Sequence, residues 1–185
     1  VKFMLTPQNK DWALSSMSEL RGEFVYIVSK ATSMPVKMYP DGHIAADGCL
    51  GRASQWRVQK LDRRSAGRPV MGFKNVMHGK HIAIAGGHVQ PGGGGEHCEL
   101  VVQRSGKAVN LIKHNNQRAK LGFNANGTPA DPKSLGNGSR ARFFIFDVDE
   151  VSRHMVAGRG RGGRGRGMMG RGRGMMGRGR GRGMM

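Results

Sequence analysis

Three segments of the chain share one order of apolar runs and turns, and this repetition limits the possible folds more than any other feature. They begin at Val25, Val70 and Val109, so their starts are 45 and 39 residues apart. Each has an apolar run, a short polar link, a second apolar run and a glycine-containing turn. A further run follows each segment, reading SQWRVQKL, HCELVVQR or RARFFIFDV. Short alternating or β-branched runs between turn residues predict an all-β domain.

The number of repeats favours one β architecture. Three units of about 40 residues, each with about four short strands, are typical of a β-trefoil, whose closed barrel leaves no long sheet edge exposed. A β-sandwich with coincidentally similar segments is the alternative. We predict a lead-in over residues 1–20, a β-trefoil over 21–150 and a disordered Arg/Gly/Met-rich tail over 151–185.

Apolar side chains predict how the domain packs. In the lead-in, Trp12, Leu14, Met17 and Leu20 line one face of a short helix or pack as irregular chain. In the repeats, side chains alternate between the two faces of a strand. The inward positions predict a core of Val36, Met38, Ile44, Trp56, Val58, Val70, Ile82, Ile84, Cys98, Leu100, Val109, Leu111, Leu121, Phe123, Phe144 and Phe146.

The charge of the chain is strongly positive. Lys and Arg total 31 against 12 Asp and Glu, a formal net charge of +19. Folding does not require this excess, because like charges destabilise a compact state. The tail from Ala157 to Met185 holds nine Arg and no Lys, Asp or Glu, so +10 remains on residues 1–156. Both parts are therefore expected to bind polyanions.

The tail repeats RGRGMMG-like units and holds 13 Gly and six Met among its 29 residues. Since ordering glycine is costly and little here can be buried in return, we expect residues 157–185 to be disordered until bound. Guanidinium groups contact phosphate or sulfate through paired hydrogen bonds. The tail candidates are Arg159, Arg161, Arg164, Arg166, Arg171, Arg173, Arg178, Arg180 and Arg182. Met pairs predict weak self-association, and the lack of Phe and Tyr predicts little sequence preference toward RNA.

Several motifs resemble the fibroblast growth factor family. The segments VKMYPDGHIAADG (36–48), VMGFKNVMHGKHIAI (70–84), EHCEL (96–100) and GNGSRARFF (136–144) are similar to its strand–turn patterns and its last loop. The resemblance covers about residues 24–148, and fascin and hisactophilin trefoils are more distantly similar. It implies a β-trefoil that binds heparan sulfate, with a cell-surface receptor as a further partner and an extracellular location. The chain departs from the family at residues 30–33 and 104–107.

The last loop is the candidate site on the folded domain. A glycine-rich link exposes backbone N–H groups that converge on an anion, and neighbouring cations add charge. By position, the resemblance implies that Lys30, Lys133, Ser139 and Arg140 contact sulfate groups. Three further cations near the third repeat extend the patch: Arg118, Lys120 and Arg142.

Catalysis is not indicated by the residue pattern. His97 and Cys98 are expected on opposite faces of a strand, so they cannot form a dyad, and Cys98 is predicted in the core. No Cys/His spacing suggests zinc, and we expect no cofactor. Asp147, Asp149 and Glu150 are expected at a solvated end of the domain. The glycine run 92–95 has no helix after it and is not a phosphate loop. The redox state of the two cysteines stays open.

Three functions are consistent with these features. The leading one is an extracellular glycosaminoglycan-binding ligand. The second is an intracellular, nuclear or cytoplasmic RNA-binding protein that acts through the tail. The third is a structural matrix or mineral-associated protein whose repeats add weak contacts to an anionic phase. No run approaches the roughly 18 to 20 apolar residues that span a bilayer, so no membrane span is expected, and the opening VKFMLTPQNK lacks the apolar core of a secretory signal.

Overall fold

The computed structural model describes Phe3 and residues 5–159, which are mostly β-sheet. The strands are β1 (Phe24–Ser29), β2 (Lys37–Met38), β3 (Ile44–Ala45), β4 (Gln55–Ser65), β5 (Arg68–Asn75), β6 (His81–Ala85), β7 (His88–Gly92), β8 (Leu100–Ser105), β9 (Ala108–Lys113) and β10 (Phe143–Asp147). The helix α1 (Val148–Arg159) follows β10. Short 3-10 helices are η1 (Asn9–Trp12), η2 (Met17–Glu19), η3 (Arg52–Ser54), η4 (Glu96–Cys98) and η5 (Ser139–Ala141).

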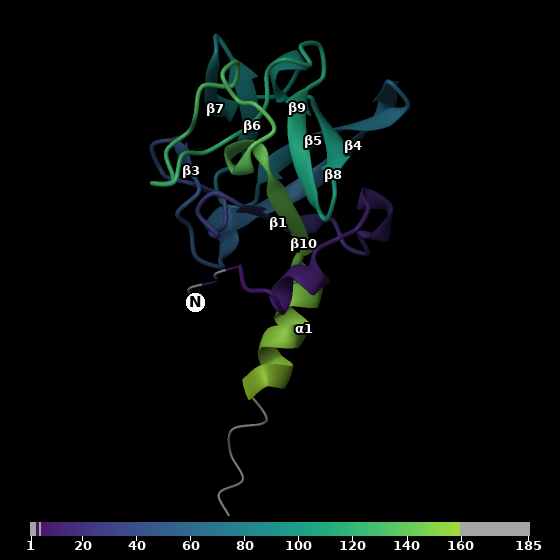
Figure 1. The fold of residues 1–185 in the computed structure, drawn as a ribbon, viewed down its shortest axis with the longest axis vertical. Helices are drawn as coiled ribbons and strands as arrows, with labels where there is room; N and C mark the ends of the chain where they lie inside the picture. The colour runs from purple at the N-terminus through teal and green to yellow at the C-terminus, as the bar shows by residue number, and fades with distance from the viewer. Residues whose placement is uncertain (1–2, 4, 160–185) are drawn as a thin grey trace, which may run out of the picture.

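Six strands pair into a closed ring. The hydrogen-bonded order is β4-β1-β10-β9-β8-β5, and β5 pairs back with β4. All of these pairings are antiparallel. Figure 1 shows β5, β8 and β9 side by side on one side of the molecule. Because the ring closes on itself, none of its six strands is left with a free edge, which disfavours the sandwich alternative.

Short hairpins lie outside the ring. β2 pairs with β3, and β6 pairs with β7 along its whole length. The β6–β7 turn uses Gly86 and Gly87 at φ 58° and 79°, a left-handed pair that suits a two-residue hairpin turn. In the third repeat the corresponding contacts are single bridges, Ile112 to Lys120 and Phe123 to Pro129. The second apolar run of this repeat, KLGF (120–123), predicts a strand but is present only as isolated bridges.

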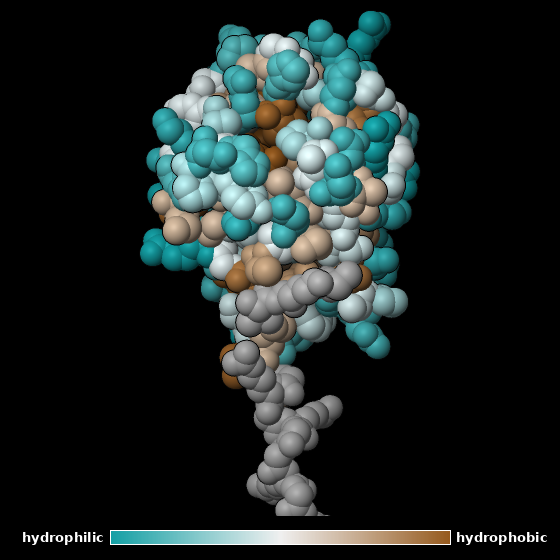
Figure 2. Space-filling model, turned by 90° about the vertical axis from the view of Figure 1, so that its left-hand side faces the viewer, coloured by the Kyte–Doolittle hydropathy of each residue, from teal (hydrophilic) through white to brown (hydrophobic). Residues whose placement is uncertain are grey.

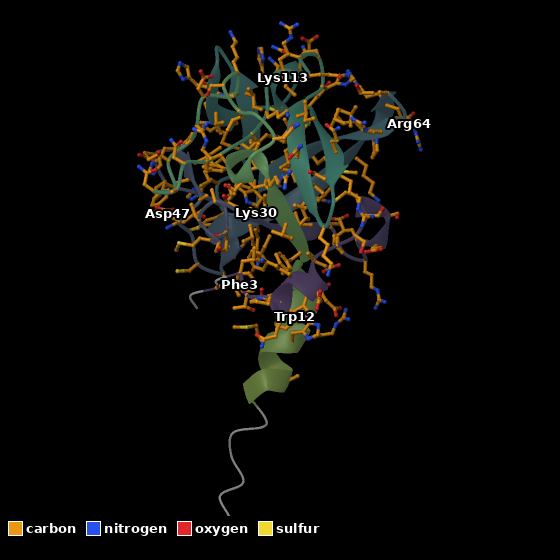
Figure 3. All side chains as sticks on the ribbon, viewed as in Figure 1. Phe3, Trp12, Lys30, Asp47, Arg64 and Lys113 are labelled. Atoms are coloured by element: carbon orange, nitrogen blue, oxygen red, sulfur yellow. The ribbon has the colours of Figure 1, made fainter. Side chains whose placement is uncertain are left out.

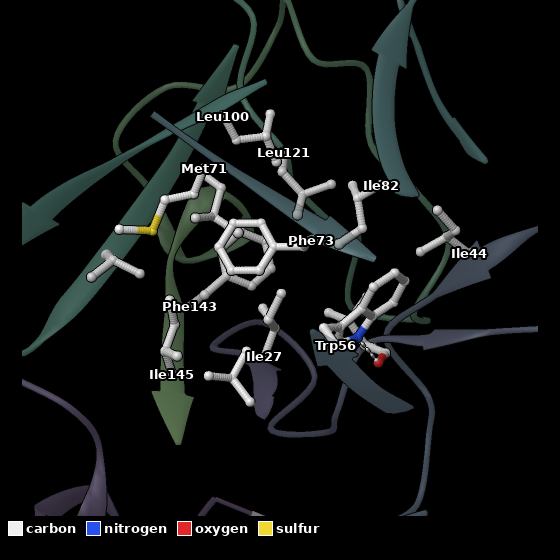
Figure 4. Packing of buried hydrophobic residues seen from close by; sticks show 14 of the residues in the cluster. Ile27, Ile44, Trp56, Met71, Phe73, Ile82, Leu100, Leu121, Phe143 and Ile145 are labelled. Atoms are coloured by element: carbon white, nitrogen blue, oxygen red, sulfur yellow. Dashed lines mark hydrogen bonds between the residues drawn. The ribbon is translucent and has the colours of Figure 1, made fainter. Parts of the chain in front are cut away.

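The main core fills the ring. Figure 4 shows Phe73 and Phe143 packed among Ile27, Met71 and Leu121. Every residue of the predicted core is buried except Val58, which is half-buried and packs against this cluster. The sequence pattern identified the inward face of β10 incorrectly. Phe143 and Ile145 enter the main core, whereas Phe144 and Phe146 belong to a second cluster on the outer face.

The second cluster explains why both faces of β10 are apolar. Phe144 and Phe146 pack with Phe3 from the lead-in and Val151 from α1. Figure 1 shows α1 extending from the end of the barrel, and Figure 3 places Trp12 beside it. Trp12 stacks on His154 of α1 with ring centroids 4.1 Å apart. The lead-in and α1 therefore cover the outer face of β10, instead of leaving it to solvent.

The lead-in contains two 3-10 turns, η1 and η2, and its four apolar side chains are divided between the clusters. Leu14, Met17 and Leu20 pack on the main core, whereas Trp12 packs on the second. The backbone N–H of Leu14 donates to the carbonyl of Ile145 at 2.8 Å. A single helical face, one of the two expectations, is not what the structure shows, because these side chains serve two different cores.

The end of the domain also differs from the expectation of a solvated chain end. Asp147 is 4% exposed, and its carboxylate accepts from the backbone N–H groups of Arg21, Gly22 and Asp149 at 3.1, 3.4 and 2.9 Å. A carboxylate that accepts an N–H in the first turn stabilises the start of a helix. Only Asp149 is exposed as expected, and α1 runs across the expected domain boundary at residue 150.

The buried His81 side chain should make the stability of the folded protein depend on pH. Its ring is buried, Nε2 lies 2.6 Å from Oε1 of Gln59, and burial together with the Lys74 charge lowers its pKa below the ordinary 6.5. The unfolded chain therefore takes up more protons as the pH falls. The stability from neutral His81 is complete above pH ~6.5 and is lost below it, at a rate of at most about 1.4 kcal/mol per pH unit.

We expect His81→Leu to gain stability relative to the wild type as the pH is lowered from ~7.5 to ~5.5. Urea unfolding at both pH values measures this difference, with His88→Leu, at an exposed site, as the matched control. Parallel pH dependence of His81→Leu and wild type would show that His81 does not titrate on unfolding.

Candidate anion-binding site

Four cationic residues line one cavity of about 380 Å³. They are Arg68 at the start of β5, Arg104 near the end of β8, Lys120 and Arg142. The remaining lining residues are Gln103, Ser105, Asn110, Ile112, Gln117 and Asn137. None of these ten residues, all within the described part of the chain, is Asp or Glu. We call this cavity the basic pocket.

Strand register explains how residues distant in sequence line the same pocket. Gln103 of β8 pairs with Asn110 of β9. Phe143 pairs with Val109 and Val70 pairs with Val101, so the antiparallel register sets Arg142 opposite Asn110 and Arg68 opposite Gln103. Side chains that are opposite across antiparallel strands lie on one face. Arg142, Asn110, Gln103 and Arg68 therefore form a row across four strands.

This row lies on the outside of the ring. Val109 and Leu111 point into the main core, and alternation along β9 turns Asn110 and Ile112 to the other face. That face is covered by α1 and the lead-in over Phe144 and Phe146, but not at the pocket. The basic pocket is thus the part of this surface where polar side chains replace the second apolar cluster.

Hydrogen bonds hold the segment from residue 120 to residue 142 beside this row of side chains. Nζ of Lys120 donates to Oδ1 of Asn137 at 2.9 Å, and the backbone of Lys120 bridges to Ile112. The N–H of Phe123 donates to the carbonyl of Arg140 at 2.9 Å. A Cβ on Gly122 would lie 2.8 Å from that same carbonyl, so these two segments of the chain approach this closely only because residue 122 is glycine. These contacts hold Lys120 and Arg142 against the same pocket.

The pocket can stabilise negative charge on a bound group. An arginine keeps its charge at all ordinary pH values and presents its N–H groups in a planar fork that fits sulfate or phosphate oxygens. Nε of Arg104 donates to the carbonyl of Gly106 at 2.9 Å, which holds that guanidinium beside the β8–β9 turn. Nε of Arg142 is buried and has no hydrogen-bond partner within the described residues. The arrangement suits binding of an oxyanion.

The structure brings together only part of the predicted site. Of the seven candidates on the domain, Lys120 and Arg142 line the basic pocket. Lys30 is exposed, and its N–H donates to the carbonyl of Arg142 at 2.9 Å. Arg118 follows Gln117 of the pocket and is exposed, as is Ser139, whose carbonyl accepts from the N–H of Arg142 at 3.2 Å. These three residues lie next in the chain, or hydrogen-bonded, to residues that line the pocket.

Arg140 and Lys133 are placed differently. Nη1 of Arg140 lies 3.4 Å from Oδ1 of Asn124. Lys133 lines a second cavity of about 540 Å³ that also holds His88 and Asp131, and its N–H donates to Oδ1 of Asp131 at 2.9 Å. Figure 2 views the side of the molecule on which β3 and β7 lie in Figure 1, and hydrophilic side chains cover most of it. Lys133 therefore does not share the basic pocket with Lys120.

Arg68 and Arg104 are the cationic pocket residues that sequence reasoning missed, and Asn110 and the other uncharged lining residues were missed too. Arg68 lies two residues before the second repeat begins and Arg104 ends the run that follows it, whereas the candidate loop belongs to the third repeat. Their only signal in the sequence is positive charge beside a glycine-containing turn, which Arg52 and Lys80 share to a similar degree. The register of β5, β8 and β9 is what distinguishes them.

The described part of the chain is expected to hold no catalytic dyad and no metal site, and the structure shows where the residues concerned lie. Cys98 is buried, burial raises its pKa, and it lies with exposed His97 in the 3-10 turn η4, not on a strand as expected. Cys49 and Cys98 are both free thiols. Over Phe3 and residues 5–159, no three His, Cys, Asp or Glu side chains gather as a metal site. Within the same residues, no helix has the length and apolar character needed to cross a bilayer.

The tail candidates are almost entirely beyond what the structure describes. Arg159 is the last residue of α1. The other eight, Arg161, Arg164, Arg166, Arg171, Arg173, Arg178, Arg180 and Arg182, lie outside the described residues. The comparison with family models found no match for this chain. A comparison with curated proteins also gave no significant match.

Proposed function

We propose that this protein is a β-trefoil that binds polyanions without catalysis, with a glycosaminoglycan of the heparan sulfate type as its lead ligand. The observation that carries this proposal is the basic pocket, where Arg68, Arg104, Lys120 and Arg142 converge without an acidic residue among the ten described residues that line it. Arginine forks and a lysine ammonium recognise sulfate and phosphate oxygens.

The strand arrangement supports the trefoil part of the proposal. Each repeat contributes two strands to the closed ring: β1 and β4, then β5 and β8, then β9 and β10. Each repeat also has a short hairpin or bridge outside the ring, namely β2–β3, β6–β7 and the bridge from Phe123 to Pro129. A threefold repetition of this kind is what the spacing of the sequence repeats predicts.

The charge distribution supports a polymeric ligand. Exposed Lys30 is hydrogen-bonded to Arg142 of the pocket and exposed Arg118 follows Gln117 of the pocket, so two further cations belong to its immediate neighbours. The sequence adds nine tail arginines that can contact further anionic groups. Each neutralised anionic site releases counterions, so binding is expected to weaken steeply with salt. A chain of sulfate groups would engage the pocket and the tail together, which increases avidity.

Neutralising two pocket cations tests the function. We expect Arg68→Gln/Lys120→Gln in the full chain to elute from heparin at lower salt. The slope of log binding constant against log salt should become less steep by about 1 to 2. The matched control is Arg52→Gln/Lys80→Gln, which removes the same charge at two exposed sites outside the pocket. Equal elution of the two double variants would contradict a role for the pocket, since both keep the whole tail.

The arginine–glycine tail supports a second candidate, single-stranded RNA. RNA binding through the tail alone would be equally strong in both double variants, because neither changes residues 157–185. RNA binding that weakens only in the pocket variant would instead assign the RNA backbone to the pocket. Filter binding with a homopolymeric RNA, at the salt concentrations used for heparin, separates these two outcomes.

A further inference from the structure

Asn110 is the most deeply buried polar residue of the basic pocket. It lies on β9, is 4% exposed, and its Oδ1 atom has no hydrogen-bond partner among the described residues. Buried side-chain oxygens are nearly always hydrogen-bonded, and one without a partner costs about 1–3 kcal/mol. This oxygen is unusual for a residue on an otherwise apolar strand, where Val109, Leu111 and Ile112 are its neighbours.

A second buried atom, with the opposite requirement, belongs to the residue just before β10. Nε of Arg142 is buried and lacks a partner among the described residues. Phe143 pairs with Val109, so Arg142 is opposite Asn110 on the same outer face, and both line the pocket. The Nε–H of arginine can only donate, and the Oδ1 of asparagine can only accept. The pocket therefore presents one buried donor and one buried acceptor together.

A bare oxyanion can satisfy only the donor. An oxygen of a sulfate or phosphate ester accepts from Nε of Arg142, and the charges of Arg68, Arg104 and Lys120 balance the negative group. Satisfying Oδ1 of Asn110 requires a hydroxyl or N–H on the same ligand, close to the ester. The cavity of about 380 Å³ is in the range of pockets that hold small organic ligands and is larger than one oxyanion needs.

We propose that the basic pocket binds a single sugar unit that carries a sulfate or phosphate ester, and that a hydroxyl of the sugar donates to Asn110. This inference rests on the proposed polyanion-binding function and adds what selects the ligand. Arg142 and the other cations hold the ester, while Asn110 discriminates between a sugar ester and an anion that lacks a hydroxyl. A site built around a buried hydrogen-bonding group rejects analogues without the partner group.

Four small ligands test the inference on the full chain. Glucose 6-sulfate and glucose 6-phosphate carry hydroxyls beside the ester, whereas ethyl sulfate and ethyl phosphate do not. Titration calorimetry should show the sugar esters binding about tenfold more tightly than the matching ethyl esters. In Asn110→Leu, which has similar size but no acceptor, this ratio should fall to within about twofold while the ethyl esters bind as before. Asn115→Leu, at an exposed site after β9, is the matched control.

The possible results distinguish a sulfate ester from a phosphate ester, and they test the role of Asn110 separately from the proposed function. Stronger binding of glucose 6-phosphate assigns the site to phosphorylated sugars, and stronger binding of glucose 6-sulfate assigns it to sulfated ones. If Arg68→Gln/Lys120→Gln weakens all four ligands but Asn110→Leu keeps the tenfold ratio, only the role of Asn110 is overturned. If that double variant binds all four ligands like the wild type, the proposed function itself fails.

A measurement on the wild-type protein tests the inference without requiring that Asn110→Leu folds. The Nε–H resonance of Arg142, assigned by its disappearance in Arg142→Lys, should shift when glucose 6-sulfate or glucose 6-phosphate is added, because a new acceptor meets that proton. An Arg142 Nε–H signal that stays in place at saturating sugar ester overturns the inference.

Discussion

Replacing Trp56 by alanine should lower the free energy of unfolding by about 3–5 kcal/mol. The Trp56 side chain is fully buried in the ring, and β4 pairs there with both β1 and β5. Its Nε1 donates to the carbonyl of Val36 at 3.0 Å, which Figure 4 shows at the edge of the core. Alanine would leave a large cavity and a buried carbonyl without its donor, and both effects destabilise the folded state.

Urea unfolding followed by far-UV circular dichroism measures this loss. Trp12→Ala is the matched control, because Trp12 is the other of the two tryptophans and is only half-buried, stacked on His154. We expect it to cost about 1–2 kcal/mol. Equal destabilisation by the two substitutions would contradict the full burial of Trp56 in the main core.

Replacing Asp147 by alanine has the second-largest expected effect, a loss of about 2–4 kcal/mol. The buried carboxylate accepts from the backbone N–H groups of Arg21 and Gly22, just before β1, and from one of α1. Hydrogen bonds to a charged group contribute more than neutral ones, and the donors would be left without this acceptor. The same substitution should increase amide hydrogen exchange over residues 148–156, because α1 would lose the contact that fixes its first turn.

Two variants test the mechanism of this loss. Asp147→Asn keeps one acceptor oxygen and should cost less than Asp147→Ala. Asp149→Ala removes an exposed carboxylate from the first turn of α1, which is expected to cost only about 0.3–1 kcal/mol. If Asp149→Ala is as harmful as Asp147→Ala, general charge at the helix start explains the effect and the buried hydrogen bonds do not.

The outer face of the ring at β10 has an apolar part and a basic part. Phe3, Phe146 and Val151 pack over the end of β10 that leads into α1, while Arg142 lies just before the start of β10, in the basic pocket. The apolar and the basic parts of this face are therefore separate. Substitutions at Asp147 or Trp12 are expected to change stability without changing ligand preference, whereas Asn110→Leu should change ligand preference.

The sequence by itself determined much of the β content and of the core. Alternating apolar residues and glycine turns predicted most strands, and nearly all of the predicted core positions are buried, because side-chain alternation and turn chemistry are local properties. The positive charge on both parts of the chain, and Lys120 and Arg142 as candidates, also came from composition and motif. The inward face of β10 could not be chosen, since Phe143, Phe144, Ile145 and Phe146 are all apolar.

Only the tertiary structure decided which of these residues meet. Arg68 and Arg142 lie 74 positions apart in the sequence, yet the register of four antiparallel strands sets them in one row with Asn110 and Gln103. Alternation predicts the face of a strand that a residue occupies but not the residue beside it on the next strand, because pairing depends on non-local closure of the ring. For the same reason, the sequence predicts a solvated end at Asp147, whereas in the structure backbone N–H groups just before β1 and in the first turn of α1 donate to its buried carboxylate.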